Sequence, residues 1–173
     1  MLVVAATDRE VASIDGADTF VCGIGPVEAA ASTARRLAER RPDAVLHIGL
    51  AGARTLEPPV LVVGSESVYE DARGSLVPAR VEPDAALLAR LCTVLPQAQV
   101  LPIGTSAYVG GSSECEVEAM EGFAVLRACA LAGVPAVELR AVSNAIDEPE
   151  RGKWLFEEAL ALLAGALERL DVR

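Results

Sequence analysis

The sequence predicts an α/β fold in which a largely parallel sheet is covered by helices on both faces. Short apolar runs alternate with segments of helical periodicity along the chain, and this alternation is typical of parallel strands joined by helical crossovers. Hydrophobic residues make up 52% of the 173 residues, which is enough to cover both faces of such a sheet. No repeat, linker or low-complexity tract divides the sequence, so we expect one domain spanning residues 1–173.

Runs rich in Val, Leu, Ile and Ala, each followed by Gly, Pro or polar residues, predict the strands. The expected strands are Leu2–Ala6, Thr19–Cys22, Ala44–Ile48, Pro59–Val63, Ser67–Tyr69, Leu76–Val81, Val100–Ile103 and Ala136–Val142. A Gly/Ser-rich loop is expected at Gly104–Glu116, where the last-but-one strand ends.

Helical periodicity and residues that start or stop helices predict the helical segments. They are expected at Val27–Arg41, Asp84–Val94, Met120–Ala132 and Lys153–Arg169. Pro26 fits a first helical turn, where its missing N–H leaves no hydrogen bond unmade. Asp84 is a natural first-turn acid, and Gly133 followed by Pro135 ends the third helix.

The stretch Val117–Asn144 places two polar side chains where a ligand can bind. Glu121 lies at the start of the third helix, and Asn144 follows the apolar run Ala136–Val142. Ligands of open α/β sheets bind just outside the carboxyl ends of strands. We therefore expect Glu121 and Asn144 to face one pocket.

Composition and charge exclude several classes of protein. The formal net charge of −10 argues against nucleic acid as a partner, since its binding requires a basic face. No apolar run is long enough to cross a membrane, and the first residues do not resemble a signal peptide. The four cysteines form no CxxC pair and the chain has one histidine, so we expect free thiols, no metal and a cytoplasmic protein.

Taken one at a time, the candidate residues have structural explanations. Glu10 after the first strand fits a solvated loop acid, and Glu121 fits a helix start favoured by the dipole. Asn144 fits a turn, and His47 on an apolar strand fits a hydrogen-bonded core residue. Gly23-x-Gly25 before a helix lacks the third glycine and the distant acid of a dinucleotide site, so a tight strand-to-helix turn is the better interpretation.

The motifs taken together resemble the purine nucleoside phosphorylase and nucleosidase superfamily. The resemblance is carried by MEG at Met120–Gly122 followed by RAVSNAID at Arg140–Asp147. Three earlier segments agree in order, and they are AATDRE ending at Glu10, GIGPVEAA at Gly23–Ala30 and HIGLAGA at His47–Ala53. With Trp154 and EEA at Glu157–Ala159, the carboxyl third is similar to the futalosine hydrolases, nucleosidases of the alternative menaquinone pathway.

The resemblance implies a three-layer α/β sandwich around a central mixed, largely parallel sheet, and an enzyme that cleaves an N-glycosidic bond without metal or organic cofactor. It implies that Glu121 holds the ribose hydroxyls, that Glu10 activates water, and that Asn144 binds the purine. Further substrate contacts are implied for Ala51, Gly52, Met120, Ser143 and Trp154. A homo-oligomer acting on a small purine nucleoside is also implied.

The residue at position 144 indicates which purine is bound. Adenine-specific nucleosidases of this superfamily have aspartic acid there, which can protonate N7 and accept from a 6-amino group. The amide of Asn144 cannot serve as that proton donor, but its NH₂ group can donate to N7 or to a 6-oxo group. The sequence therefore favours a 6-oxopurine such as hypoxanthine, the base of futalosine.

Three other functions stay open. The first is a phosphorylase, which needs cations around phosphate. Thr7–Glu10 lacks the Gly-Asp-Pro segment of the phosphorylases, and His47 stands where they place arginine. Arg9 and Arg54 remain as candidate phosphate ligands. A methylthioadenosine-type nucleosidase and a non-catalytic nucleoside-binding protein are the other two. The short connection between Ile103 and Val117 leaves open the base-side contacts of Thr105, Ser106 and Tyr108.

Overall fold

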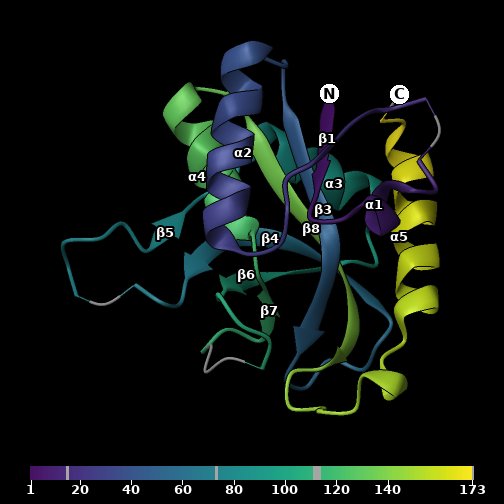
Figure 1. Ribbon diagram of the computed structural model, residues 1–173. Coiled ribbons are helices and arrows are strands. Elements are labelled where there is room, and N and C mark those ends of the chain that lie inside the picture. The colour runs from purple at the N-terminus through teal and green to yellow at the C-terminus, as the bar shows by residue number, and fades with distance from the viewer. Residues whose placement is uncertain (15, 73, 111–113, 173) are drawn as a thin grey trace.

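The computed structural model describes residues 1–14, 16–72, 74–110 and 114–172. These residues form an eight-stranded mixed sheet with helices on both faces (Figure 1). The strands are β1 (Leu2–Ala5), β2 (Asp18–Val21), β3 (Val45–Ala53), β4 (Val60–Tyr69), β5 (Arg80–Val81), β6 (Gln99–Thr105), β7 (Val117–Ala119) and β8 (Ala136–Ala145). The helices are α1 (Asp8–Val11), α2 (Pro26–Glu39), α3 (Ala85–Val94), α4 (Gly122–Ala132) and α5 (Phe156–Leu170), with a short 3-10 helix, η1, at Arg151–Lys153.

The sheet is largely parallel, as the alternation of strands and helices predicts. Strand β1 pairs in parallel with β2 and β3, β3 with β8, β4 with β6, and β6 with β7. The pairings of β3 with β7, of β4 with β5 and of β4 with β8 are antiparallel. The predicted fold class, a mixed sheet layered between helices, is confirmed.

Five of the strands close into a ring. Strand β3 pairs with β8, β8 with β4, β4 with β6, β6 with β7, and β7 pairs back onto β3. Strands β3 and β4 are consecutive in the sequence, but β8 lies between them. This placement brings the end of β8, with Ser143 and Asn144, into the middle of the sheet.

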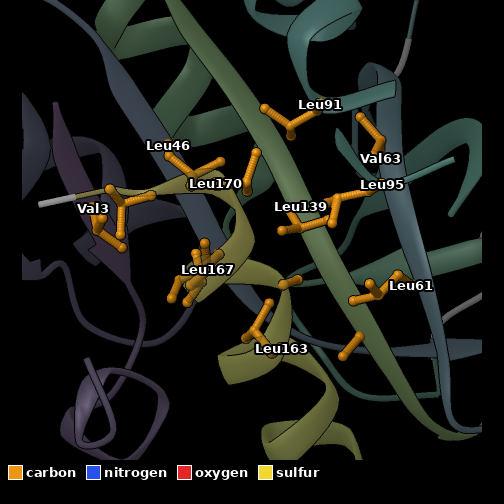
Figure 2. Packing of buried hydrophobic residues seen from close by; sticks show 14 of the residues in the cluster. Val3, Leu46, Leu61, Val63, Leu91, Leu95, Leu139, Leu163, Leu167 and Leu170 are labelled. Atoms are coloured by element: carbon orange, nitrogen blue, oxygen red, sulfur yellow. The ribbon is translucent and has the colours of Figure 1, made fainter. Parts of the chain in front are cut away.

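Two apolar layers hold the helices against the sheet. One cluster joins α3 and α5 to the strands through leucine and valine side chains, including Leu139 of β8 and Leu163 of α5 (Figure 2). The other lies on the opposite face, where α2 and α4 pack against β1 and β3. Burying one such leucine contributes about 1.5–3 kcal/mol, so both layers fix the strands whose ends carry the polar residues.

Some predicted elements differ in extent. The predicted strands Pro59–Val63 and Ser67–Tyr69 are one strand, β4, with an irregularity between Gly64 and Glu66. The predicted strand Leu76–Val81 is reduced to β5. The last helix begins at Phe156 instead of Lys153 because residues 151–153 form η1.

Two short elements lie where the sequence pattern predicts none. Helix α1 follows β1 directly, and β7 precedes α4. Both are too short to show a period of their own. Residues 111–113 of the expected loop at Gly104–Glu116 lie outside the described residues.

No helix within the described ranges is long and apolar enough to cross a membrane.

Candidate active site

A cavity of about 300 Å³ lies beyond the carboxyl ends of β1, β3 and β8. Its wall includes all eight residues that the sequence nominates, namely Glu10, Ala51, Gly52, Met120, Glu121, Ser143, Asn144 and Trp154. The wall also includes Glu118, which the sequence-based prediction did not name. A space of this size suits a small organic ligand.

Glu10 is locked in place by three hydrogen bonds. Its Oε2 accepts from the backbone N–H and from the hydroxyl of Thr7, each at 2.9 Å. Its Oε1 accepts from the backbone N–H of Leu50 at 3.0 Å. Thr7 is the N-cap of α1, and Glu10 is the third residue of that helix, which is the spacing of a capping box. The local sequence therefore buries this carboxylate and aims it into the cavity instead of leaving it in a solvated loop.

Glu121 stands at the N-cap position of α4 and is 4% exposed. Its Oε1 accepts from the backbone N–H of Gly25 at 3.0 Å, and its Oε2 lies 3.7 Å from Nη2 of Arg140. Gly25 has a φ of 89°, a left-handed conformation that favours glycine. The glycine turn before α2 therefore serves to direct an N–H at this carboxylate.

Burial raises the pKa of Glu121 above its ordinary value, whereas Arg140 and the N–H of Gly25 act in the opposite direction. Desolvation disfavours the charged carboxylate, and a nearby positive charge favours it. Nearby Glu10 and Glu138 raise this pKa further. Protonation state at this position is thus sensitive to the charges around it.

Arg140 lies at the centre of a buried charged cluster, which consists of Glu10, His47, Glu121, Glu138 and Arg140. Its Nε donates to Oε1 of Glu138 at 2.8 Å, and its Nη2 bonds to Nε2 of His47. The pKa of Arg140 is raised by the three carboxylates, although burial alone would lower it. The guanidinium is completely buried, so its positive charge offsets the carboxylates next to it.

His47 is a neutral core residue. Burial and the charge of Arg140 lower its pKa well below the ordinary value. Its Nδ1–H donates to the carbonyl of Val4 at 3.0 Å, which leaves Nε2 as an acceptor for Arg140. The interpretation of His47 as a hydrogen-bonded core residue is confirmed.

Asn144 is presented by a bulge near the end of β8. Ala51 pairs with Val142 and Gly52 pairs with Asn144, so Ser143 is an additional residue between the two pairs. Such bulges re-aim side chains and are common next to active sites. The amide Nδ2 donates to the carbonyl of Ala145 and Oδ1 accepts from the hydroxyl of Ser143, both at 2.8 Å. These two bonds fix which end of the amide is the donor.

The rim of the cavity is partly aromatic. The indole of Trp154 is held by a hydrogen bond to the carbonyl of Glu148 at 3.0 Å, and its ring lies 5.3 Å from that of Phe156. The guanidinium of Arg9 lies over the Phe156 ring and is paired with Glu157. All three of Trp154, Phe156 and Arg9 line the cavity.

Other residues considered from the sequence lie away from the cavity wall. Thr105 accepts a hydrogen bond from the backbone N–H of Phe123 at 2.8 Å, which supports the start of α4. Ser106 is buried and Tyr108 is half exposed, and neither lines the cavity. The Nε of Arg54 donates to the carbonyl of Cys115, outside the cavity.

Sequence reasoning gave no role to Arg140, Glu138 or Glu118. A signal for the first two was present, because two charges at i and i+2 in an otherwise apolar strand must share one face and be paired there. Gly122 was a further signal, since a Cβ at that position would come within 2.3 Å of both carboxylate oxygens of Glu138. Glu118 lies on a strand of three residues and carries no periodic signal.

The arrangement combines two buried carboxylates with an amide and an aromatic rim around one cavity. Carboxylates held in this way can accept hydrogen bonds from hydroxyls, stabilise a positive charge and take a proton from water. Within the described part of the chain, His, Cys, Asp and Glu form no group of three or more that could hold a metal ion.

A family model described as the phosphorylase superfamily matches residues 19–172. The chain belongs to this superfamily. The futalosine hydrolase of Streptomyces coelicolor is 37% identical, with 90% of this chain and 79% of the relative aligned. The 5'-methylthioadenosine/S-adenosylhomocysteine nucleosidase of Actinobacillus succinogenes is 33% identical, with 82% and 73% aligned.

Solved structures share the fold. The native futalosine hydrolase of Helicobacter pylori strain 26695 superposes with a TM-score of 0.87 at 19% identity, over 98% of this chain and 96% of that chain. The 5'-methylthioadenosine/S-adenosylhomocysteine nucleosidase of Helicobacter pylori, solved with butyl-thio-DADMe-Immucillin-A, gives a TM-score of 0.89 at 18% identity, over 98% of this chain and 96% of that chain.

Proposed function

We propose that this protein is a futalosine hydrolase, an N-glycosidic hydrolase that releases hypoxanthine from futalosine. The observation that carries the proposal is that Glu10, Glu121 and Asn144, which come from three distant parts of the chain, line one cavity. The 37% identity to the Streptomyces coelicolor futalosine hydrolase over 90% of the chain supports the same reaction and substrate.

In the proposed reaction, the bond between C1′ of the ribose and N9 of the purine breaks and leaves its electron pair on the base. Positive charge then develops on the ribosyl ring, as in the hydrolysis of glycosides. We assign the stabilisation of that charge to Glu121, which accepts hydrogen bonds from the ribose hydroxyls. Charge-assisted bonds of this kind contribute roughly 1.5–3 kcal/mol each.

Water completes the reaction at C1′. Glu10 takes one proton from the water as the water oxygen forms the new bond to C1′. The departing purine takes a proton from solvent, and Glu10 then releases to solvent the proton that it accepted. Base catalysis of this kind accelerates reactions by about 10²–10⁴-fold. The bonds from Thr7 and Leu50 hold Glu10 in one orientation, so the carboxylate does not have to reorganise during the step.

The purine end of the cavity is assigned to Asn144. Its Nδ2 has a second hydrogen beyond the one given to Ala145, and that hydrogen can be donated to O6 or N7 of hypoxanthine. Met120, Ala51 and Gly52 supply the surface on which the sugar packs, and Trp154 closes the other side. These residue roles are part of the proposal.

A methylthioadenosine-type nucleosidase is the second candidate, and the 33% identity to the Actinobacillus succinogenes nucleosidase supports it. Asn144 favours the first candidate, since an asparagine cannot protonate N7 of adenine. Phosphorolysis is disfavoured because Arg9 is already paired with Glu157 and Arg54 does not line the cavity.

The test is to incubate the purified protein with futalosine, inosine and methylthioadenosine, each with and without phosphate, and to quantify the released base by chromatography. We expect hypoxanthine from futalosine in phosphate-free buffer. A strict requirement for phosphate would instead identify a phosphorylase, and release of adenine alone would identify the second candidate. Saturable binding without turnover would identify a non-catalytic nucleoside-binding protein.

A further inference from the structure

Glu138 is a buried acid to which the proposed reaction gives no part. It lies on β8 two residues before Arg140, is completely buried, and does not line the cavity. A glutamate is almost never buried so completely unless it is paired. The role of Glu138 is therefore to be found in the groups that it holds.

Groups from three elements surround this carboxylate. Its Oε1 accepts from Nε of Arg140 at 2.8 Å, and its Oε2 accepts from the hydroxyl of Ser67 on β4. A Cβ at Gly122, the first residue of α4, would lie 2.3 Å from each of its two oxygens. The carboxylate therefore has one fixed place against the start of α4, and this fixes the Nε edge of Arg140 as well.

The opposite edge of the guanidinium faces Glu121. Nη2 of Arg140 bonds to Nε2 of His47 and lies 3.7 Å from Oε2 of Glu121. This separation is longer than a hydrogen bond, although two buried opposite charges attract each other more strongly than they would in water. Because Oε1 of Glu121 already accepts from Gly25, Oε2 has more acceptor capacity left for a ligand.

We propose that Glu138 is a positioning residue, which binds Nε of Arg140 and thereby keeps the guanidinium out of hydrogen-bond contact with Glu121. Oε2 of Glu121 then stays available to the ribose hydroxyls, while Arg140 still offsets its charge. This inference rests on the proposed function, which assigns the ribose hydroxyls to Glu121. The pKa of Arg140 is consistent with such a competition, because burial acts to lower it and Glu138 raises it more than Glu121 or Glu10 does.

The first test compares crystal structures of the wild type and of Glu138→Met, which removes the acceptor and has a similar side-chain volume. Without the bond to Nε, the guanidinium should move onto the nearest remaining carboxylate. We expect the distance between Nη2 of Arg140 and Oε2 of Glu121 to shorten from 3.7 Å to about 2.7–2.9 Å, the length of a charge-assisted hydrogen bond.

The second test measures what the ribose hydroxyls contribute to binding. Inosine and 2′,3′-dideoxyinosine, which lacks both hydroxyls, compete with futalosine, and the ratio of their inhibition constants gives this contribution for each protein. We expect the wild type to bind inosine roughly 10-fold or more tightly than dideoxyinosine, and this preference to fall by roughly 10-fold in Glu138→Met, which is the scale of one charge-assisted hydrogen bond. A loss of stability alone would leave the preference unchanged.

The matched control is Glu66→Gln. Glu66 on β4 also pairs with an arginine, Arg80, but this ion pair lies near the surface and outside the cavity. The distance between Arg140 and Glu121 and the preference for inosine should both equal those of the wild type.

The conservative variant Glu138→Gln keeps an oxygen that can accept from Nε of Arg140. Its preference for inosine should fall by only about 3-fold, because a neutral acceptor bonds about half as strongly as a charged one. If circular dichroism shows that Glu138→Met does not fold, Glu138→Gln decides both tests, with an expected distance below about 3.2 Å between Arg140 and Glu121.

The outcomes separate this inference from the proposed function. If the wild type hydrolyses futalosine, an unchanged distance or an unchanged preference in the Glu138 variants overturns the inference and leaves the function standing, and so does a wild type that binds both nucleosides alike. If the wild type does not hydrolyse futalosine, the proposed function fails. The crystal structures then decide the positioning of Arg140 by themselves, since a shortened distance supports it and an unchanged one overturns it.

Discussion

Glu121 is buried at a position where ionisation of its carboxyl group lowers the stability of the folded protein. Burial raises its pKa above the ordinary value of 4.5, even though Arg140 lies 3.7 Å away. A raised pKa in the folded protein means that stability is full below the unfolded-state value and is lost as the pH rises through the folded-state value. A carboxyl group whose pKa is perturbed by burial and by a specific charged neighbour is typical of a functional site.

Replacing Glu121 by Gln therefore separates activity from stability. We expect Glu121→Gln to remain folded and to lose at least about 10- to 100-fold in kcat with futalosine, because one charge-assisted contact in the transition state is removed. We also expect it to melt at a higher temperature than the wild type above the folded-state pKa of Glu121. That difference should fade as the pH falls toward 4.5.

The measurement is a series of thermal unfolding curves from pH 4.5 to slightly alkaline pH, together with initial rates at each pH. Near wild-type turnover in Glu121→Gln would contradict the proposed role of Glu121. A variant that is less stable than the wild type at alkaline pH would show that the ion pair with Arg140 outweighs the burial of the charge.

Asn144 tests the purine end of the site. Asn144→Asp introduces a group that can hold a proton for N7 and accept from a 6-amino group, so we expect the ratio of kcat/KM for methylthioadenosine to that for futalosine to rise. The expected change is roughly 10-fold or more, the scale of one buried hydrogen-bond mismatch. An unchanged ratio between the two substrates would contradict the inference drawn from this amide.

At the scale of elements, glycines set how closely the strands and their charged side chains approach. A Cβ at Gly49 of β3 would lie 2.2 Å from Nη1 of Arg140 and 2.7 Å from Oε1 of Glu10. Both groups are buried and already bonded, so they have little room to move. Gly165 of α5 differs, since a Cβ there would meet nothing within 4 Å.

We expect Gly49→Ala to lower the free energy of unfolding by about 1–3 kcal/mol, as overpacking does, and to reduce turnover because Glu10 is displaced. The matched control Gly165→Ala should raise the free energy of unfolding by roughly 0.5–1 kcal/mol through helix propensity and leave turnover unchanged. Denaturant unfolding and initial rates measure both effects. Equal stabilities of Gly49→Ala and the wild type would mean that Arg140 and Glu10 can shift to accommodate the added Cβ despite their hydrogen bonds.

The longer helices and strands were predictable because each has its own hydrophobic periodicity or residues that start or stop it. Helix α3 begins where Asp84 accepts hydrogen bonds from the N–H groups of Ala86 and Leu87, and Gly133 ends α4 with a φ of 64°. The short elements were not predictable. The three residues of β7 are a strand only because β3 and β6 pair with them, which is tertiary information.

The site was predictable to the extent that its residues follow strand ends. Ser143 and Asn144 lie at the end of an apolar run and Glu10 lies four residues beyond another, and the carboxyl ends of both runs meet on one side of the sheet. Glu118 was not predicted because it lies in a strand of three residues, where sequence alone does not reveal which face opens onto a cavity. The spacing of Glu138 and Arg140 indicates that they are paired, but it does not reveal that Glu121 lies beside them. Their surroundings depend on strands that are distant in the sequence.

At the scale of the whole molecule, the apolar surface around the cavity mouth is where we expect a second copy of the chain to bind. Ile24 and Val109 line the cavity yet remain exposed, and Val27 in the first turn of α2 is 77% exposed. Exposed apolar patches beside a site mark interaction surfaces. The homo-oligomer implied by the sequence resemblance would cover this patch with a second copy of the chain.

We expect size-exclusion chromatography with light scattering to give a mass of at least two chains for the wild type, and a monomer for Val27→Asp. An acid in a first helical turn is compatible with the helix, so the variant should stay folded. The control is Leu131→Asp, which removes an equally exposed leucine from the far end of α4 and should keep the wild-type mass. A monomeric wild type would contradict the expected assembly.

The insertion of β8 between β3 and β4 has a consequence for how the protein is made. A ribosome releases β3 and β4 well before it releases β8, so these two strands emerge without the neighbour that separates them. Arg140 and Asn144 arrive with β8, and until then Glu10 and Glu121 have neither their counter-charge nor their companion amide. Because β8 joins segments far apart in sequence, its docking closes long loops, which slows folding. The capacity to bind a nucleoside should therefore emerge late during synthesis and in one step.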